Sequence, residues 1–149
     1  MRLDSLDLSG SGVTDLSPLR DMPLTELDLF NASQLKDLLP LNGMSLKYLN
    51  VGRTSVSDLS PVGKMMTLQA LILSETPLTE LSALQGLPLR SLRMEKTSIP
   101  DLAPLKGMPL KQLWFDLRGG PDEAVVRSLT GLEQINNLPA EEFWKSQGK

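Results

Sequence analysis

Acidic side chains recur in this chain at a spacing that would let them act together as ligands. Asp7 and Asp28 are separated by 21 residues, and Asn50 follows 22 residues later. A structural repeat of that length would bring their oxygen atoms side by side, and such oxygens are the ligands that Ca²⁺ prefers. A column of exposed acids is normally just hydrated, however, so we expect neither a metal site nor a cofactor.

A second acidic series recurs at a similar spacing, at Asp15, Asp37, Asp58, Glu80 and Asp101. Each acid stands directly before an apolar residue, and in four units a proline follows shortly after. An aspartate at such a position accepts hydrogen bonds from the following backbone amides, as at a helix N-cap. We therefore interpret this series as structural, with no catalytic role.

The composition removes most of the groups that catalysis uses. The chain has no His and no Cys, so it lacks the commonest general base, a thiol nucleophile, disulfides and the usual zinc ligands. Gly119-Gly120 lacks the Lys and Ser/Thr of a phosphate-binding loop. A net charge of −3 argues against a protein that binds nucleic acid. We expect no enzyme, no catalytic residue and no nucleic-acid partner.

A leucine repeat positions these side chains. The pattern Leu-x-x-Leu-x-Leu begins at Leu3, Leu24, Leu46, Leu68, Leu89 and Leu110. A period of 21 or 22 residues is typical of leucine-rich repeats. The alternating apolar positions predict a short strand in each unit, and stacked units make a parallel sheet. The segment after each acid predicts a short 3₁₀ or α turn. We predict an α/β fold: a right-handed solenoid with a parallel concave sheet and short turns on its convex side.

The repeat changes character near residue 119, so we divide one continuous domain into repeats over 1–118 and a C-terminal part over 119–149. Two acids after Pro121 predict the start of a true helix. A shortened last strand is expected at Leu132–Ile135, and a capping helix over residues 139–145. Phe143 and Trp144 would then cover the open end of the stack.

Local departures from the repeat lead to two further expectations. Thr54, Thr76 and Thr97 stand where leucine-rich repeats usually carry Asn, and we expect their hydroxyls to bond turn carbonyls between coils. One extra residue in 31–34 and another in 65–67 should form bulges in the turns without shifting the strand register.

The N-terminal sequence bears on location and context. Residues 1–6 include no apolar core of a signal peptide, and no apolar run reaches the ~18 residues of a membrane span. We expect a cytoplasmic protein without membrane contact. No capping segment precedes the first leucine triplet, so we expect its coil to contact a parent domain or a second copy of the chain, as in a fragment of a longer protein.

Two segments carry a resemblance to known families. Residues 13–19 (VTDLSPL) and 99–110 (IPDLAPLKGMPL) resemble the short leucine-rich repeats of bacterial internalin-like proteins. The ending, from Leu129 to Lys145, is similar to the C-terminal repeat regions of bacterial serine/threonine protein kinases and of uncharacterised relatives. The resemblance implies an interaction domain. It transfers no phosphoryl chemistry, because the chain contains no kinase motif.

The candidate site follows from the strands, whose side chains alternate between the core and the concave surface. The outward residues that we select for partner binding are Asp7, Asp28, Phe30, Tyr48, Asn50, Ile72, Arg93 and Trp114. Exposed aromatic side chains are typical of binding hot spots. We therefore predict a non-catalytic module that binds another protein through this face. The alternative is a structural spacer or capping domain of a larger protein, for example one that contains a kinase.

Size and charge refine that prediction. Six strands give a sheet only ~24 Å wide, so a tight partner should also contact the loops over 31–34 and 118–122. Acids gather on the first two strands at Asp4, Asp7, Glu26 and Asp28, whereas Lys47, Arg53, Arg90, Arg93 and Lys111 lie towards the later ones. A partner of opposite polarity is the natural complement.

Overall fold

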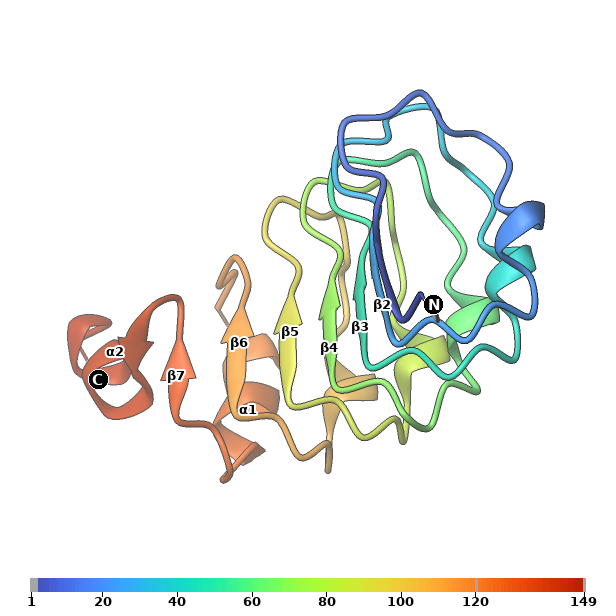
Figure 1. Cartoon of the computed structure of the whole chain (residues 1–149). Coiled ribbons are helices and arrows are strands. Elements are labelled where there is room, and N and C mark those ends of the chain that lie inside the picture. The colour runs from blue at the N-terminus through green and yellow to red at the C-terminus, as the bar shows by residue number, and fades with distance from the viewer. Residues whose placement is uncertain (1–2, 120, 149) are drawn as a thin grey trace.

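Each repeat contributes one short strand, and the strands stack in chain order into a single sheet. The computed structural model describes residues 3–119 and 121–148. The first six strands are β1 (Ser5–Asp7), β2 (Glu26–Asp28), β3 (Tyr48–Asn50), β4 (Ala70–Ile72), β5 (Ser91–Arg93) and β6 (Gln112–Trp114). Every neighbouring pair is parallel, with the central leucines in register. Figure 1 shows these strands side by side along the length of the molecule.

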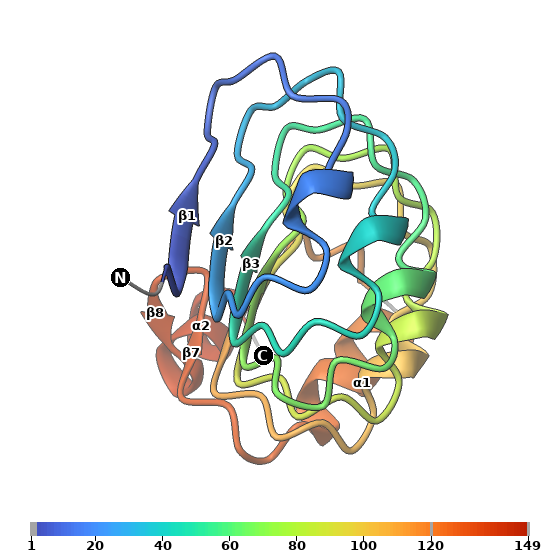
Figure 2. The same ribbon diagram turned by 45° about the vertical axis from the view of Figure 1, so that its right-hand side comes forward.

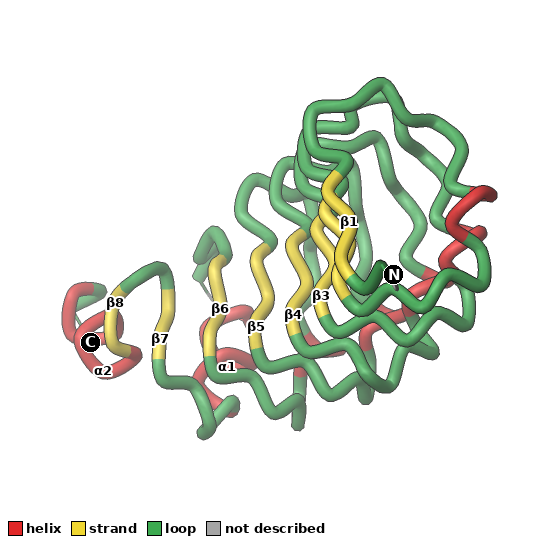
Figure 3. The backbone as a smooth tube through the Cα atoms, in the orientation of Figure 1, coloured by secondary structure: helices red, strands yellow, loops and turns green. Residues whose placement is uncertain are grey.

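The opposite wall of the solenoid consists of short 3₁₀ helices, one in each unit. They are η1 (Ser17–Leu19), η2 (Leu39–Leu41), η3 (Ser60–Val62), η4 (Ser82–Leu84) and η5 (Ala103–Leu105). Figure 2 shows the strands on one side of the coils and these helical turns on the other, and Figure 3 separates the two walls by colour. The leucine-rich repeat solenoid predicted from the period is therefore the fold of this chain.

Aspartates fix the entry to these helical turns. The backbone N–H of Ser17 donates to Oδ1 of Asp15 over 2.8 Å, and Ser60 donates to Asp58 over the same distance. Asp37 and Asp101 hold the equivalent amides two residues ahead. In each case the leucine after the acid occupies the N-cap position. The aspartates thus form Asx turns one residue before the cap, instead of being the caps themselves.

The core is a stack of leucines from both walls. Leu27, Leu49, Leu71 and Leu92, at the centres of four successive strands, are fully or almost fully buried. The first coil is more open, because Leu3 is 42% exposed and Leu6 and Leu8 are only partly buried. Burial of apolar surface between neighbouring coils is the main source of stability in such a stack.

The buried threonines bond within their own coil, so the expected bonds between coils are wrong. The hydroxyl of Thr54 donates to the carbonyl of Val51 over 2.7 Å, and Thr76 and Thr97 repeat this bond to Leu73 and Met94. The acceptor is three residues back because the chain turns sharply after each strand, which brings that carbonyl next to the hydroxyl.

Thr76→Val should test this bond. Valine keeps the shape of threonine but removes the hydroxyl, so the Leu73 carbonyl loses its partner. We expect the free energy of unfolding to fall by about 1 to 2 kcal/mol, measured by urea denaturation. Thr79→Val, at an exposed position, is the matched control and should change stability little. Equal effects of the two substitutions would contradict the role given to the Thr76 hydroxyl.

The two extra residues are absorbed in loops, as predicted. The chain leaves η3 through Gly63 with ψ −9°, whereas it leaves the other four 3₁₀ helices with ψ between 125° and 134°. Met66, in this altered exit, is exposed. The pairing of β2 with β3 and of β3 with β4 keeps the leucines in register across both insertions.

The C-terminal part closes one end of the stack. It contains α1 (Pro121–Ser128), β7 (Gln134–Ile135), β8 (Leu138–Pro139) and α2 (Ala140–Ser146). The two helices and the shortened strand lie where the sequence predicts them, whereas β8 is an addition. It runs antiparallel to β7, and both turn residues between them, Asn136 and Asn137, have positive φ. Two consecutive residues of this kind form the tight turn typical of a two-residue hairpin.

Aromatic and amide side chains join this end to the last coil. Phe143 of α2 is 4% exposed, with its ring 6.4 Å from that of Phe115 and 5.1 Å from that of Trp144. The side-chain amide of Asn136 accepts a hydrogen bond from the backbone N–H of Phe115 and donates one to its carbonyl. Asn136 therefore pairs with the backbone of the last coil as a neighbouring strand would.

Within the described ranges, no helix has both the length and the apolar character needed to cross a membrane.

Candidate functional site

The strand register places the predicted site residues on one face, which we call the sheet face: the outward side chains of β1 to β6 and of the residues that directly follow each strand. Asp7, Asp28, Asn50, Ile72, Arg93 and Trp114 occupy equivalent positions in six successive strands. Phe30 follows β2 by two residues, and Tyr48 begins β3. All eight residues therefore belong to one surface.

The acidic column is occupied by bonds within the chain. Oδ1 of Asp7 accepts the amide N–H of Ser9, and Oδ1 of Asp28 accepts that of Phe30, each over 2.8 Å. Hydrogen bonding from the Ser9 side chain, and then from its backbone N–H, lowers the pKa of Asp7. Among the described residues, no group of three or more His, Cys, Asp or Glu side chains is arranged to hold a metal ion.

Asn50 continues this column and is the one candidate that contributes little surface. Its Oδ1 accepts the N–H of Gly52 over 3.0 Å, and its Nδ2 donates to Oδ2 of Asp28 over 3.2 Å. Only 7% of Asn50 is exposed, although we expected it to face a partner.

The Tyr48 hydroxyl lies in a negatively charged neighbourhood. It donates to Oδ2 of Asp28 over 3.3 Å. Partial burial is the main cause that raises the pKa of Tyr48 above its ordinary value of 10.0, and the negative charges of Asp28 and Glu26 raise it further. The phenolate would stand beside these carboxylates, so the neutral phenol is favoured.

Titration of Tyr48 should therefore report on this part of the face, because it is the only tyrosine in the chain. We expect Asp28→Asn to lower its pKa more than Glu26→Gln does, as followed by phenolate absorbance, while Glu80→Gln on the opposite wall leaves the pKa unchanged. Since the pKa is raised in the folded state, the proton is lost first from the unfolded chain. Stability should thus fall as pH rises above 10. A Tyr48 pKa at or below 10.0 in the native protein would contradict this.

A groove crosses the sheet face beside β4. It measures about 460 Å³ and is lined by Phe30, Asn50, Ile72, Ser74, Glu75, Arg93, Glu95 and Lys96. Phe30, 37% exposed, and the half-buried Ile72 provide its apolar lining. Four of the eight candidate residues, Phe30, Asn50, Ile72 and Arg93, thus line one groove, whereas the other four lie outside its lining: Asp7, Asp28, Tyr48 and Trp114.

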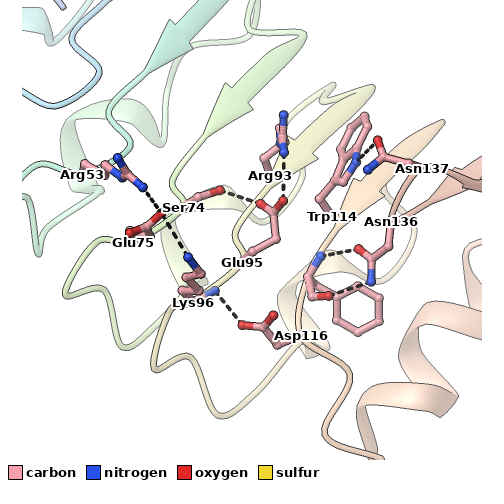
Figure 4. Close-up of polar contacts among 11 residues, drawn as sticks. Arg53, Ser74, Glu75, Arg93, Glu95, Lys96, Trp114, Asp116, Asn136 and Asn137 are labelled. Atoms are coloured by element: carbon pink, nitrogen blue, oxygen red, sulfur yellow. Dashed lines mark hydrogen bonds and ion pairs between the residues drawn. The ribbon is translucent and has the colours of Figure 1, made fainter. Parts of the chain in front are cut away.

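A first ion-pair cluster lies in the turns that follow β3, β4 and β5 (Figure 4). Oε1 of Glu75 is 3.0 Å from a guanidinium nitrogen of Arg53 and 3.5 Å from Nζ of Lys96. The hydrogen bond from Arg53 lowers the pKa of Glu75. The guanidinium carbon of Arg53 also lies 5.4 Å from the centre of the Phe30 ring, within the range of a cation–π contact.

A second cluster holds Glu95. Its carboxylate accepts the Ser74 hydroxyl over 2.5 Å and a guanidinium N–H of Arg93 over 3.0 Å. Burial acts to raise the pKa of Glu95, but these two hydrogen bonds outweigh it, so the pKa is lowered overall. The Arg93 guanidinium also lies 5.0 Å from the Trp114 ring centre. Among the described residues its Nε is buried without a hydrogen-bond partner.

Trp114 has a structural contact as well as an exposed face. Its indole Nε1 donates to Oδ1 of Asn137 over 2.9 Å, which ties β6 to the hairpin that follows it. Replacing Trp114 would therefore disturb the C-terminal end as well as the surface. Arg118, in a loop that we expected to supply partner contacts, donates instead to the carbonyls of Ile99 and Thr97.

The sequence-based selection missed the turn residues of the groove. Arg53, Glu75 and Lys96 occupy the same position in three successive units, together with Asn31, and all four have φ between 55° and 60°. Their order of charge, positive, negative and positive at a spacing of 22 and 21 residues, is a pattern that predicts ion pairs between stacked coils. This alternation of charge is visible in the sequence when the repeat units are aligned with one another.

Comparison with known proteins adds to this description. No protein-family model matches the sequence, and no curated protein sequence matches it. Two solved structures from Listeria monocytogenes are similar. An internalin (inlF) has a TM-score of 0.76 and 25% identity over 88% of this chain, and internalin C2 has a TM-score of 0.77 and 29% identity over 89% of it. This chain spans 39% and 60% of the lengths of those two proteins.

Proposed function

We propose that this leucine-rich repeat protein, which resembles bacterial internalins in structure, is a non-catalytic module that binds another protein through its sheet face. This sheet face is the surface that the sequence predicts to be concave. The observation that carries the proposal is the groove beside β4, in which Phe30 and Ile72 expose apolar surface between paired charges. Apolar and aromatic anchors within a polar rim are the usual composition of a protein interface.

The rest of the site supports binding and offers little for catalysis. Four of its carboxylates, those of Asp7, Asp28, Glu75 and Glu95, are held in Asx turns or ion pairs. A surface of fixed, hydrogen-bonded side chains loses little entropy when a partner docks. Both similar structures are internalins. That this chain binds a protein partner is our proposal. Its cytoplasmic location stays a prediction.

Paired substitutions on the two walls of the solenoid test the proposal. Phe30→Ala with Ile72→Ala removes the apolar lining of the groove, whereas Leu39→Ala with Met66→Ala removes two apolar side chains that are even more exposed but lie away from the sheet face. We expect the first pair to weaken capture of a specific protein from the source-cell lysate about tenfold or more, the loss typical of interface anchors, and the second pair to leave it unchanged. Quantitative mass spectrometry of cross-linked complexes measures this.

Capture that survives loss of Phe30 and Ile72 would overturn the proposal. The alternative is a spacer or capping domain of a larger protein, for example one that contains a kinase. It is favoured by the open first coil, where Leu3 is 42% exposed. It predicts that neither pair of substitutions changes any specific capture. The full reading frame of the gene then identifies the domain next to the repeats.

A further inference from the structure

We propose that the partner of the sheet face is a polypeptide that places basic side chains over β1 and β2 and an uncharged apolar side chain in the groove beside β4. This inference rests on the proposed function and specifies the chemistry of the partner. It combines two independent features of one surface, which are a set of uncompensated carboxylates and a neighbouring groove whose charges cancel.

The first feature is an acidic cluster at the β1–β2 end of the sheet, formed by Asp7, Glu26 and Asp28 of the sheet face and by Asp4, which directly precedes β1. Throughout 3–119 and 121–148, no Lys or Arg forms an ion pair with any of them. Lys47 is the cation closest in the register, since its backbone N–H bonds to the Thr25 carbonyl next to Glu26, yet its side chain pairs with none of the four. A partner can neutralise these charges where the chain itself does not.

The raised pKa of Tyr48 supports the presence of an uncompensated negative potential at this acidic cluster. Its hydroxyl lies next to Asp28, and after burial the charges of Asp28 and Glu26 are what raise its pKa. A neighbouring cation on the protein would offset such an effect. The phenol therefore indicates a negative potential at β2 and β3 that is available to a positively charged partner.

The second feature is the electrical balance of the groove. The lining carries two carboxylates, Glu75 and Glu95, and two cations, Arg93 and Lys96. Glu95 pairs with Arg93, and Glu75 pairs with Lys96 and also with Arg53, which lies outside the lining. A charged group entering the groove would have to displace one of these pairs and lose water at the same time. An uncharged group meets Phe30 and Ile72 without that cost. The groove, at about 460 Å³, lies in the lower part of the ~300 to 1,000 Å³ range of ligand pockets.

The separation of the two features sets the form of the ligand. From β1 and β2 to β4 there are two to three strand spacings, or about 10 to 14 Å. An extended peptide covers that distance in about three or four residues at ~3.3 Å each. The complementary motif thus has two basic residues, a spacer of about three residues and one apolar residue.

The test uses a blocked peptide of sequence Arg-Arg-Ser-Gly-Ser-Leu as the probe, titrated into isotope-labelled protein and followed by amide chemical shifts. Two matched peptides replace both Arg with Glu or replace Leu with Gly. We expect the first peptide to shift amides of β1 to β4, and each replacement to weaken binding about threefold or more. Because arginine stays charged at high pH, saturation with the first peptide should also lower the pKa of Tyr48.

Charge variants of the protein supply the second arm. Asp4→Asn with Glu26→Gln removes two carboxylates whose side chains make no bond in the described structure, and Glu80→Gln with Glu142→Gln removes two exposed carboxylates elsewhere. The first pair should weaken peptide binding about three- to tenfold, as expected for two exposed ion pairs, and the second pair should not. High salt should weaken binding in the same direction.

Equal binding of the Glu peptide, shifts confined to other regions, or no shift with any peptide would overturn this inference. The proposed function fails separately. If Phe30→Ala with Ile72→Ala abolishes capture of the protein partner but Asp4→Asn with Glu26→Gln does not, then binding through the sheet face stands and the basic character of the partner is wrong.

Discussion

Leu71→Asp is expected to abolish cooperative folding of the repeats around β4. Leu71 lies at the centre of β4, buried and in register between Leu49 and Leu92. The substitution loses about 1.5 to 3 kcal/mol of apolar burial and places a carboxylate among buried apolar side chains. Burying such a charge costs several kcal/mol more. The total is comparable with the whole stability of a domain, about 5 to 15 kcal/mol.

Circular dichroism and urea denaturation measure this effect. The matched control is Leu39→Asp in η2. Leu39 is also a leucine of the repeats, but it is 59% exposed. We expect the control to unfold at nearly the same urea concentration as the native protein. An unchanged midpoint for Leu71→Asp would contradict the inward orientation of the central strand position, and with it the register of the whole sheet.

Phe143→Ala should detach the C-terminal end of the solenoid. Phe143 is buried between Phe115 of the last coil and Trp144 of its own helix. Truncating a buried phenylalanine to alanine typically costs about 3 to 5 kcal/mol. Because each coil contacts mainly its neighbours, this loss should fall first on α2, β8 and β7. Hydrogen exchange should then speed up strongly at the amides of β7 and less at those of β2 and β3.

Loss of this end has a second expected consequence. The edge of β6 and the apolar end of the stack become accessible, and unprotected strand edges promote association between chains. Light scattering should show concentration-dependent aggregation of Phe143→Ala. Glu142→Ala, the neighbouring exposed position on α2, is the control and should remain unaffected. Uniformly faster exchange in all coils of Phe143→Ala would show that the solenoid unfolds as a single unit instead.

Most of the fold could be predicted because the same apolar pattern occurs in six successive units. One segment with the pattern Leu-x-x-Leu-x-Leu is ambiguous, but six such segments spaced by 21 or 22 residues leave a single register in which the pattern's apolar residues all face inward. That is why the strand centres at Leu27, Leu49 and Leu92 lie where the sequence predicts them. The 3₁₀ turns of the proline-containing segments could also be predicted, because proline fixes the backbone angle φ at the start of such a turn.

The parts that escaped prediction depend on side chains meeting across coils or across a turn. The Thr76 hydroxyl has several carbonyls within reach of its unit, and only the geometry of the turn selects Leu73. Strand β8 has two residues, too few for any periodicity. Asn50 lies on the predicted face, but the bonds to Asp28 and Gly52 that cover it belong to neighbouring coils and turns. Such contacts form only when the coils stack on one another, so they cannot be read from the sequence of a single unit.

The amide of Asn136 makes the last coil's edge chemically different from every other edge in the array. By bonding both the N–H and the carbonyl of Phe115, one side chain satisfies the positions that an additional parallel strand would need. The hairpin and α2 thus bind the last coil through backbone atoms of Phe115 and through the side chains of Trp114 and Phe115. Fused after the last strand of an engineered leucine-rich array that carries Trp and Phe at the positions of Trp114 and Phe115, the segment from residue 132 to residue 148 should close the C-terminal end of that array.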